Sequence, residues 1–166
     1  MKTPKKIINF LDKAGVKYDV IEHRKVYTAL DKSKTLRVKE SMVGKTVVLS
    51  SGSYRFLVLT SADSIINLDK LAKVVSKEIG KEVKKISFAS EKWIKENIKG
   101  MKQGVTPPFG DIWGLPVFIE NSFLKNTKII INSGVHTESI KMTPAAFKKV
   151  NNNLVGGVFS KKRRGV

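Results

Sequence analysis

The sequence predicts a single domain of the mixed α/β (α+β) class. Short β-branched segments typical of strands are interspersed with amphipathic segments at helical spacing, without a regular β-α repeat. The chain has 166 residues and is 41% hydrophobic, which is enough for one domain with a sizeable core. Neither a glycine-rich dinucleotide fingerprint nor a P-loop lysine motif is present, so the sequence does not predict a nucleotide-binding fold.

The N-terminal third predicts two helices and three strands. Thr3 and Pro4 are typical of a helix start, Ile7 and Leu11 share one face of the helix, and Gly15 ends it. Gly44 precedes a β-branched run, and a Ser-Gly turn at 50–53 connects this run to the next. The expected elements are a strand over 18–23, a helix over 28–40 and a hairpin formed by strands over 45–49 and 54–60.

The remaining sequence predicts further elements around one Gly/Pro-rich loop. The clearest amphipathic helix covers 67–80, with an apolar stripe that includes Leu71 and Val75. The other expected elements are a strand over 85–89, a helix over 90–99, a loop over 100–114, strands over 116–121, 128–132 and 138–142, and a helix over 143–150. We therefore place the domain at residues 1–150 and a C-terminal basic tail at 151–166, in which Lys161–Arg164 would contact phosphate.

The formal net charge is +18, and it is unevenly distributed. Residues 1–45, 70–102 and 139–166 carry +7, +6 and +7, whereas 46–69 and 103–138 each carry −1. This distribution favours contact with a polyanion at the periphery, around a less charged site. A lysine-rich thermophilic surface is the alternative, but 14 acidic residues are few for the ion-pair networks of such surfaces.

Composition also excludes several classes of protein. Without cysteine there is no disulfide, thiolate zinc site, iron–sulfur cluster or cysteine nucleophile, and two histidines cannot by themselves form a metal centre. We therefore expect no metal and no cofactor. No apolar run approaches the ~20 residues that span a bilayer, and the N-terminus does not resemble a signal peptide. These patterns predict a cytoplasmic protein without membrane contact.

Few residues are typical of general acid–base or nucleophilic catalysis. His23 lies at the end of a predicted strand, where a structural role is the simpler interpretation, while His136 lies in a glycine-containing turn and could serve either role. No nucleophile elbow, zinc-binding helix or dense carboxylate cluster accompanies them.

Stabilisation of negative charge is better supported by the sequence. In the segment from Gly104 to Gly110, two prolines restrict the backbone, two glycines permit close approach to a ligand, and unpaired amides could face an oxyanion. A tight structural connection is the alternative. Lys45 opens an apolar strand, where its ammonium could bind phosphate at a pocket rim or simply be solvated.

These segments together resemble the YbaK/ProX family, the free-standing relatives of the editing domain inserted in bacterial prolyl-tRNA synthetases. The resemblance covers about residues 15–150. Four segments carry it in the same order: Gly44-Lys45-Thr46-Val-Val-Leu, Ser61-Ala-Asp63 before Leu68-Asp69-Lys70-Leu71, Ser87-Phe-Ala-Ser90-Glu, and Gly104-Val-Thr-Pro-Pro-Phe-Gly110.

The resemblance implies a mixed central sheet or partial barrel flanked by helices, and a trans-editing deacylase that hydrolyses the ester of mischarged tRNA, in many members tRNA for proline. It implies catalytic roles for Lys45, Gly104 and Pro108, with Lys45 near the terminal adenosine. Substrate would be bound by Thr46, Val105, Thr106, Pro107, Phe109, Gly110, Gly134 and His136. An aminoacyl ester is already activated, so oriented water and oxyanion donors could suffice, with assistance from the terminal ribose hydroxyl.

Aminoacylated tRNA is the expected partner, and a synthetase is a second candidate. Two alternatives to the enzyme remain. One is a tRNA-binding adaptor or regulator of a synthetase that keeps the fold without hydrolysis, and the other is a basic RNA-binding protein without aminoacyl recognition. The lysine and the Gly-x-x-x-Pro loop favour the enzyme over both alternatives. The RNA-binding protein is further disfavoured because the sequence lacks the aromatic strand motif of RRM domains.

Overall fold

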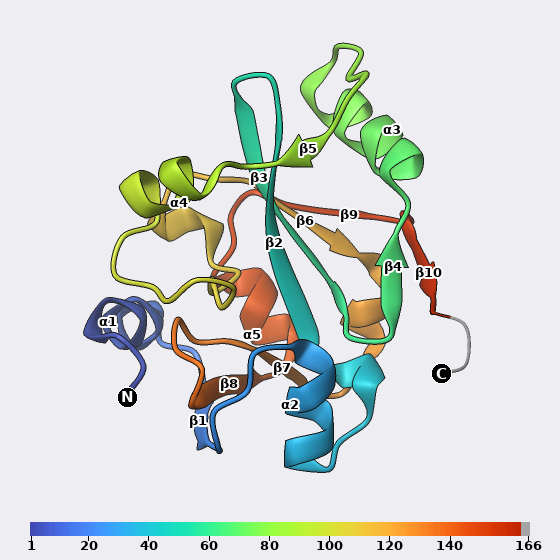
Figure 1. Cartoon of the computed structure of the whole chain (residues 1–166). Helices are drawn as coiled ribbons and strands as arrows, with labels where there is room; N and C mark the ends of the chain where they lie inside the picture. The colour runs from blue at the N-terminus through green and yellow to red at the C-terminus, as the bar shows by residue number, and fades with distance from the viewer. Residues whose placement is uncertain (164–166) are drawn as a thin grey trace.

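A long β-hairpin runs through the middle of the protein, and helices surround it (Figure 1). The computed structural model describes residues 1–163. The hairpin belongs to a five-stranded sheet with the order β5-β2-β3-β6-β9. Its strands are β2 (Gly44–Ser51), β3 (Tyr54–Ser61), β5 (Ser87–Phe88), β6 (Val117–Glu120) and β9 (Leu154–Gly157). Strand β2 is antiparallel to β3 and β5, whereas β3–β6 and β6–β9 are parallel, so the sheet is mixed.

A second sheet adjoins the start of β2 and gives the protein its partial-barrel character. It is antiparallel with the order β1-β8-β7, and a parallel bridge between Val43 and Ile130 connects it to the chain entering β2. A separate antiparallel pair joins β4 to β10. The bounds are β1 (Asp19–Glu22), β4 (Ser64–Ile66), β7 (Ile129–Asn132), β8 (Glu138–Met142) and β10 (Ser160–Lys162). The predicted mixed α/β class is confirmed.

Within residues 1–163, five α-helices and three short 3₁₀ helices accompany the sheets. They are α1 (Lys5–Ala14), α2 (Ala29–Leu36), α3 (Leu68–Ile79), α4 (Glu91–Asn97), α5 (Pro144–Lys149), η1 (Glu40–Met42), η2 (Gly110–Ile112) and η3 (Asn121–Lys125). The helix expected over 28–40 ends four residues early, because Arg37 adopts a left-handed conformation with φ 56°. Over residues 1–163, no helix has the length and apolar character needed to cross a membrane.

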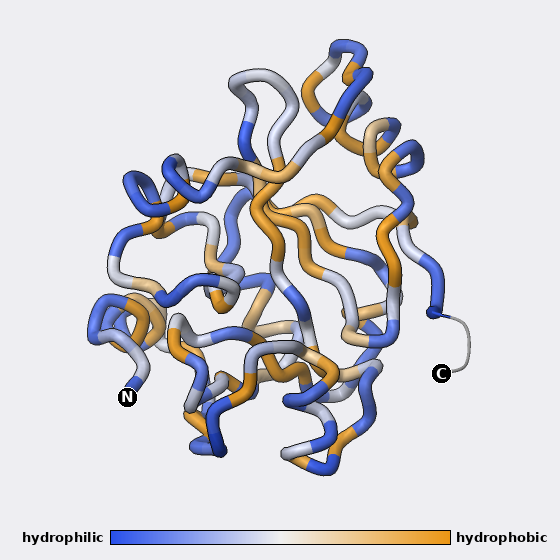
Figure 2. The backbone as a smooth tube through the Cα atoms, viewed as in Figure 1, coloured by the Kyte–Doolittle hydropathy of each residue, from blue (hydrophilic) through white to orange (hydrophobic). Residues whose placement is uncertain are grey.

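The alternation of side chains along β2 creates two separate apolar environments. Leu49 packs on one side of the sheet with Leu71 and Val75 of α3, whereas Val48 packs on the other side with Ile98, just beyond α4. Figure 2 shows the hydrophobic stretches gathered along the crossing strands and the hydrophilic ones along the outer turns. Residues that are neighbours in β2 therefore face different surroundings.

The C-terminal segment forms two strands within the described residues 151–163, in contrast to the basic tail predicted at 151–166. Strand β9 extends the five-stranded sheet and β10 pairs with β4. The side chain of Phe159 is fully buried, and the buried Glu120 carboxylate accepts hydrogen bonds from the Phe159 and Ser160 amides at 3.0 and 2.7 Å. Residues 154–159 are mostly apolar, and burial of the Phe159 side chain stabilises the folded conformation of this segment. Of the predicted basic cluster Lys161–Arg164, Arg164 lies outside the described residues.

Candidate active site

The first candidate site is a mostly apolar cavity of about 270 Å³ between β2, α4 and the loop before η2. We call it the loop cavity; its lining includes Thr46, Val48, Ala89, Ile94, Ile98, Met101, Gly104 and Thr106. Glu91, Lys95 and Lys102 contribute the charged part of the lining. Its size is near the lower end of small-molecule sites, which suits a small group. The predicted residues Thr46, Gly104 and Thr106 are thus brought together.

The loop presents backbone donors to this cavity. Gly104 has φ 82°, a left-handed conformation that favours glycine, and open space surrounds its Cα. Among residues 1–163, the amides of Gly104 and Thr106 have no protein acceptor, whereas Gly110 N–H donates to Asn151. The buried Thr46 hydroxyl is likewise without a partner in this part of the chain. Three polar groups without a partner in residues 1–163 thus belong to residues that line the cavity.

Two buried asparagines hold the loop in place. Asn132 Nδ2 donates to the Thr106 carbonyl at 3.3 Å. Asn151 Nδ2 donates to the Pro108 carbonyl at 3.2 Å, and its Oδ1 accepts from the Gly110 amide at 3.1 Å. Such contacts satisfy buried backbone groups that a loop without regular structure would otherwise leave unpaired. They restrict the conformations open to the loop.

Behind Asn132 lies a buried lysine that sequence reasoning missed. Lys32, in α2, is only 4% exposed. Its Nζ donates a hydrogen bond to Asn132 Oδ1 at 3.0 Å. Burial lowers the pKa of Lys32 to about 8. Lys32 is four residues before Leu36, which packs in a core cluster, and this spacing could have indicated that the lysine shares the inward face of the helix.

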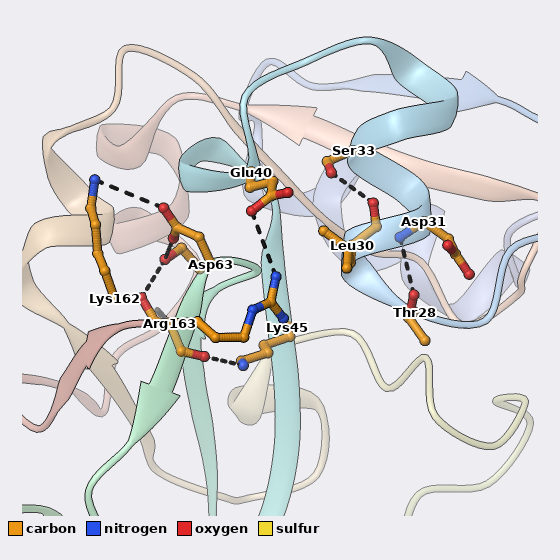
Figure 3. A network of polar contacts seen from close by, with 11 residues as sticks. Thr28, Leu30, Asp31, Ser33, Glu40, Lys45, Asp63, Lys162 and Arg163 are labelled. Carbon is orange, nitrogen blue, oxygen red and sulfur yellow. Dashed lines mark hydrogen bonds and ion pairs between the residues drawn. The ribbon is translucent and has the colours of Figure 1, made fainter. Parts of the chain in front are cut away.

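Lys45 lies on the other side of β2. It contributes to a second, largely apolar groove of about 410 Å³, which we call the Lys45 groove, together with Val47, Leu49 and residues of β4 and β5. Its Nζ donates to the carbonyl of Ser64. Burial, and secondarily the positive charge of Arg163, lowers the pKa of Lys45, while Asp63 acts in the opposite direction. Figure 3 shows Lys45 near Asp63 and Arg163.

Lys45 and the loop therefore contribute to two different cavities. Consecutive side chains of a strand point to opposite faces, and Lys45 is absent from the lining of the loop cavity, whereas Thr46 belongs to it. The two sites nevertheless adjoin each other, because Val47 and Phe88 line both. Phe88 is 76% exposed and stands between them.

Pro108, predicted to be catalytic, and most of the remaining predicted substrate-binding residues are buried parts of the scaffold. Val105, Pro107 and Pro108 are buried, and Phe109 packs in the core with its ring 5.7 Å from that of Phe10. Gly110 is also buried, and a Cβ at this position would collide with the Leu115 carbonyl. These five residues shape the loop from beneath.

Neither Gly134 nor His136 is among the residues that line the loop cavity. Gly134 has φ 104°, its carbonyl accepts from Lys102 N at 2.8 Å, and a Cβ there would meet Met101. The His136 ring is 4.8 Å from that of Tyr27, and its Nδ1 is 3.1 Å from the Val26 carbonyl. Gly134 thus supports the start of the loop, and His136 faces the segment before α2.

The described part of the chain contains no cluster of side chains suited to bind a metal ion. Within residues 1–163, no three His, Asp or Glu side chains come together in an arrangement that could hold an ion. The fold and its cavities define a mixed α/β domain with a small loop-lined site beside a largely apolar groove that contains Lys45.

Comparisons with known proteins agree with this architecture. The family model described as "Aminoacyl-tRNA editing domain" matches residues 23–150. The "Prolyl-tRNA editing protein ProX" of Acetoanaerobium sticklandii is 30% identical over 128 residues, covering 76% of this chain and 74% of that protein. The chain therefore belongs to the aminoacyl-tRNA editing domain family.

Solved structures show the same fold at low identity. A protein proposed to be a trans-editing enzyme for prolyl tRNA synthetase has a TM-score of 0.79 at 17% identity, with 97% of this chain and 98% of that chain covered. A hypothetical protein of known structure has a TM-score of 0.77 at 16% identity, with 94% and 99% covered. The predicted family resemblance is confirmed.

Proposed function

We propose that the protein is a trans-editing aminoacyl-tRNA deacylase that hydrolyses the ester of mischarged tRNA, with tRNA for proline as the substrate. The observation that carries this proposal is the pair of unpaired amides, from Gly104 and Thr106, at a small apolar cavity in a chain of the editing family. The name of the relative from Acetoanaerobium sticklandii supports the choice of tRNA for proline. Such a role implies a cytoplasmic protein.

The chemistry requires little beyond positioning. Water attacks the carbonyl carbon of the ester, the carbonyl oxygen becomes an oxyanion, and the bond to the ribose oxygen breaks to release amino acid and tRNA. In our proposal the amides of Gly104 and Thr106 donate to the oxyanion. The Thr46 hydroxyl, which lacks a partner within residues 1–163, orients the water or the amino group, and the terminal ribose hydroxyl assists the attack.

The lining of the loop cavity supports a small, apolar aminoacyl side chain. Val48, Ile98 and Met101 have no hydrogen-bond donor or strong acceptor that could bind a polar side chain. One methylene is worth only about 1–3 kcal/mol in binding, so the size of the cavity would exclude larger acids more effectively than its contacts would select smaller ones.

Lys45 serves in this proposal as a phosphate ligand outside the cavity. Its position in the neighbouring groove fits a nucleotide that passes Phe88 after its aminoacyl group has entered the loop cavity. Desolvation strengthens the attraction of a half-buried ammonium for a phosphate, because the local dielectric constant is lower than that of water.

The test is a deacylation assay with alanyl-, cysteinyl-, seryl- and threonyl-tRNA, each prepared on tRNA for proline and on a second tRNA. We expect the wild-type protein to accelerate ester loss on at least one small aminoacyl group, and Lys45→Ala to weaken this effect. Binding of uncharged tRNA is measured in parallel. No acceleration on any substrate, with binding intact, would contradict the enzyme and favour the adaptor.

A further inference from the structure

Three exposed apolar side chains line the Lys45 groove. In the described part of the chain seven large hydrophobic residues are exposed, and three of them, Ile65 at 45%, Leu68 at 48% and Phe88 at 76%, line this groove. Phe88 lies in the two-residue strand β5, whose burial pattern is exposed at both positions. A phenyl ring held open to solvent on a sheet edge is a surface on which a planar group can stack.

A basic strand continues from this groove. Ile65 also lines a neighbouring hollow of about 350 Å³, whose other walls are Lys161, Lys162 and Arg163. In the β4–β10 pair, Ile65 is the register partner of Lys161, so the apolar groove and the cationic strand are directly adjacent. Together with Lys45, these residues make a continuous surface that is aromatic at one end and cationic along the rest.

Two carboxylates neutralise part of this charge. Asp63 Oδ2 is 3.9 Å from Lys162 Nζ, and Glu40 Oε2 is 3.8 Å from Arg163 Nη2 (Figure 3). Within residues 1–163, Lys161 has no ion-pair partner, and its side chain is exposed. An excess of positive charge therefore remains beside the apolar groove. This charge attracts an acidic or polyanionic ligand and disfavours a basic one.

We propose that the Lys45 groove and strand β10 form a binding track for single-stranded RNA, in which a base stacks on Phe88 and the backbone phosphates contact Lys45, Lys161 and Lys162. Aromatic side chains beside a cationic groove are the combination that binds single strands with little sequence preference. The partial neutralisation of Lys162 by Asp63 moderates its contribution. Where this track serves the proposed deacylation, it holds the unpaired 3′ end whose aminoacyl group enters the loop cavity, and in that respect it rests on the proposed function.

The binding experiment uses the full chain and two fluorescent RNA hairpins, one blunt and one with a four-nucleotide single-stranded 3′ overhang. Neither RNA is aminoacylated, so the result does not depend on hydrolysis. We expect tighter binding of the overhang hairpin. Phe88→Leu keeps an apolar side chain but removes the aromatic face, and we expect it to raise the Kd of the overhang hairpin on the order of 5- to 10-fold while leaving the blunt hairpin unchanged.

The cationic strand is tested by Lys161→Gln/Lys162→Gln, with Lys5→Gln/Lys6→Gln on α1 as the control pair with the same charge change. Lys5 and Lys6 are exposed like Lys161 and Lys162. Each lost phosphate contact should reduce the slope of log K against log salt by about 0.7 for the overhang hairpin. The control pair should retain that slope.

Equal affinity of the wild type for both hairpins would overturn the track, and so would Phe88→Leu binding the overhang as tightly as the wild type. Dimer dissociation in Phe88→Leu, without a change in RNA binding, would instead assign the groove to a second copy of the chain. A protein that binds the overhang through Phe88 but leaves every ester intact would keep the track and contradict only the deacylase. Thermal unfolding of each variant establishes that it is folded.

Discussion

Lys32 Nζ donates to Asn132 Oδ1 at 3.0 Å, and Asn132 in turn donates to the Thr106 carbonyl at 3.3 Å. A buried ammonium in α2 is thus two hydrogen bonds away from the loop that lines the candidate active site. Within residues 1–163 no carboxylate forms an ion pair with Lys32. The positive charge of Lys32 contributes to lowering the pKa of His23, which burial lowers most. This arrangement stabilises the loop at the cost of burying a charge.

The buried ammonium makes stability depend on pH. The folded-state pKa of Lys32, about 8, is below the ordinary value of 10.5, so the folded protein binds this proton less tightly than the unfolded chain. The penalty is fully present below pH 8 and disappears as pH rises toward 10.5, and its size is on the order of 3 kcal/mol.

We therefore expect Lys32→Met to raise the free energy of unfolding at pH 7 by about 1–3 kcal/mol. The difference between the variant and the wild type should shrink between pH 8 and 10.5, because the wild type is relieved of the charge there. Urea denaturation across this pH range measures both quantities. A difference that stays constant with pH would mean that the folded state does not penalise the ammonium.

The Thr46 hydroxyl provides a direct test of the loop cavity. Within residues 1–163 this hydroxyl has no hydrogen-bond partner, so Thr46→Val should leave stability unchanged or slightly higher. If the hydroxyl binds substrate or water, kcat/KM for deacylation should fall about 3- to 10-fold. Thr60→Val is the matched control, since the Thr60 hydroxyl is also buried without a partner but is the β-sheet neighbour of Lys45 on the other face. Equal effects of the two changes would contradict a specific role for Thr46.

Gly104 is constrained by its backbone and not by space. An alanine there meets no atom within 4 Å, but its φ of 82° would be strained, and we expect Gly104→Ala to cost about 1 kcal/mol of stability. A displaced loop should also lower kcat on the order of 100-fold. Gly80→Ala at the end of α3 has a similar φ of 73° and equally open surroundings. It should lose comparable stability and retain full activity, and a retained kcat in Gly104→Ala would argue against the loop amides as oxyanion donors.

Asn151 fastens the other end of the loop. Its removal in Asn151→Ala leaves the buried Gly110 amide and Pro108 carbonyl unpaired, which should reduce the free energy of unfolding by about 2–3 kcal/mol. Asn152→Ala controls for composition, because the Asn152 side chain is exposed. Chemical denaturation should distinguish the two variants, and equal stability of both would show that the asparagine bonds contribute little.

The folded C-terminal segment is tested at Phe159. Its ring is fully buried, so Phe159→Ala should destabilise the protein by about 3–5 kcal/mol. Val158→Ala, next to it but at a residue that is 64% exposed, should change stability by less than about 0.5 kcal/mol. A Phe159→Ala variant with nearly unchanged stability would contradict the folded segment and support the tail predicted from the sequence.

Several elements were predictable because their signals are local. The helix start at Thr143 and Pro144, the end of α1 at Gly15 and the cap of α3 at Asn67 depend on side chains within a few residues, and the structure has them there. The β2–β3 hairpin follows from two β-branched runs around a short turn. The two strands within 154–162 are short and the segment is highly charged, so its sequence predicts a tail. Strand β9 forms by pairing with β6, and β10 by pairing with β4, and neither partner is near in sequence.

The fold class, the family and the loop from Gly104 to Gly110 were predictable from the amino-acid sequence alone. Which residues share a site became clear from the packing of the folded chain. Strand alternation separates Lys45 from Thr46, burial assigns Phe109 to the core, and a hydrogen bond across 100 positions of the chain joins Lys32 to Asn132. Local signals report on residues near in sequence, whereas a site is formed by residues that packing brings together from distant segments.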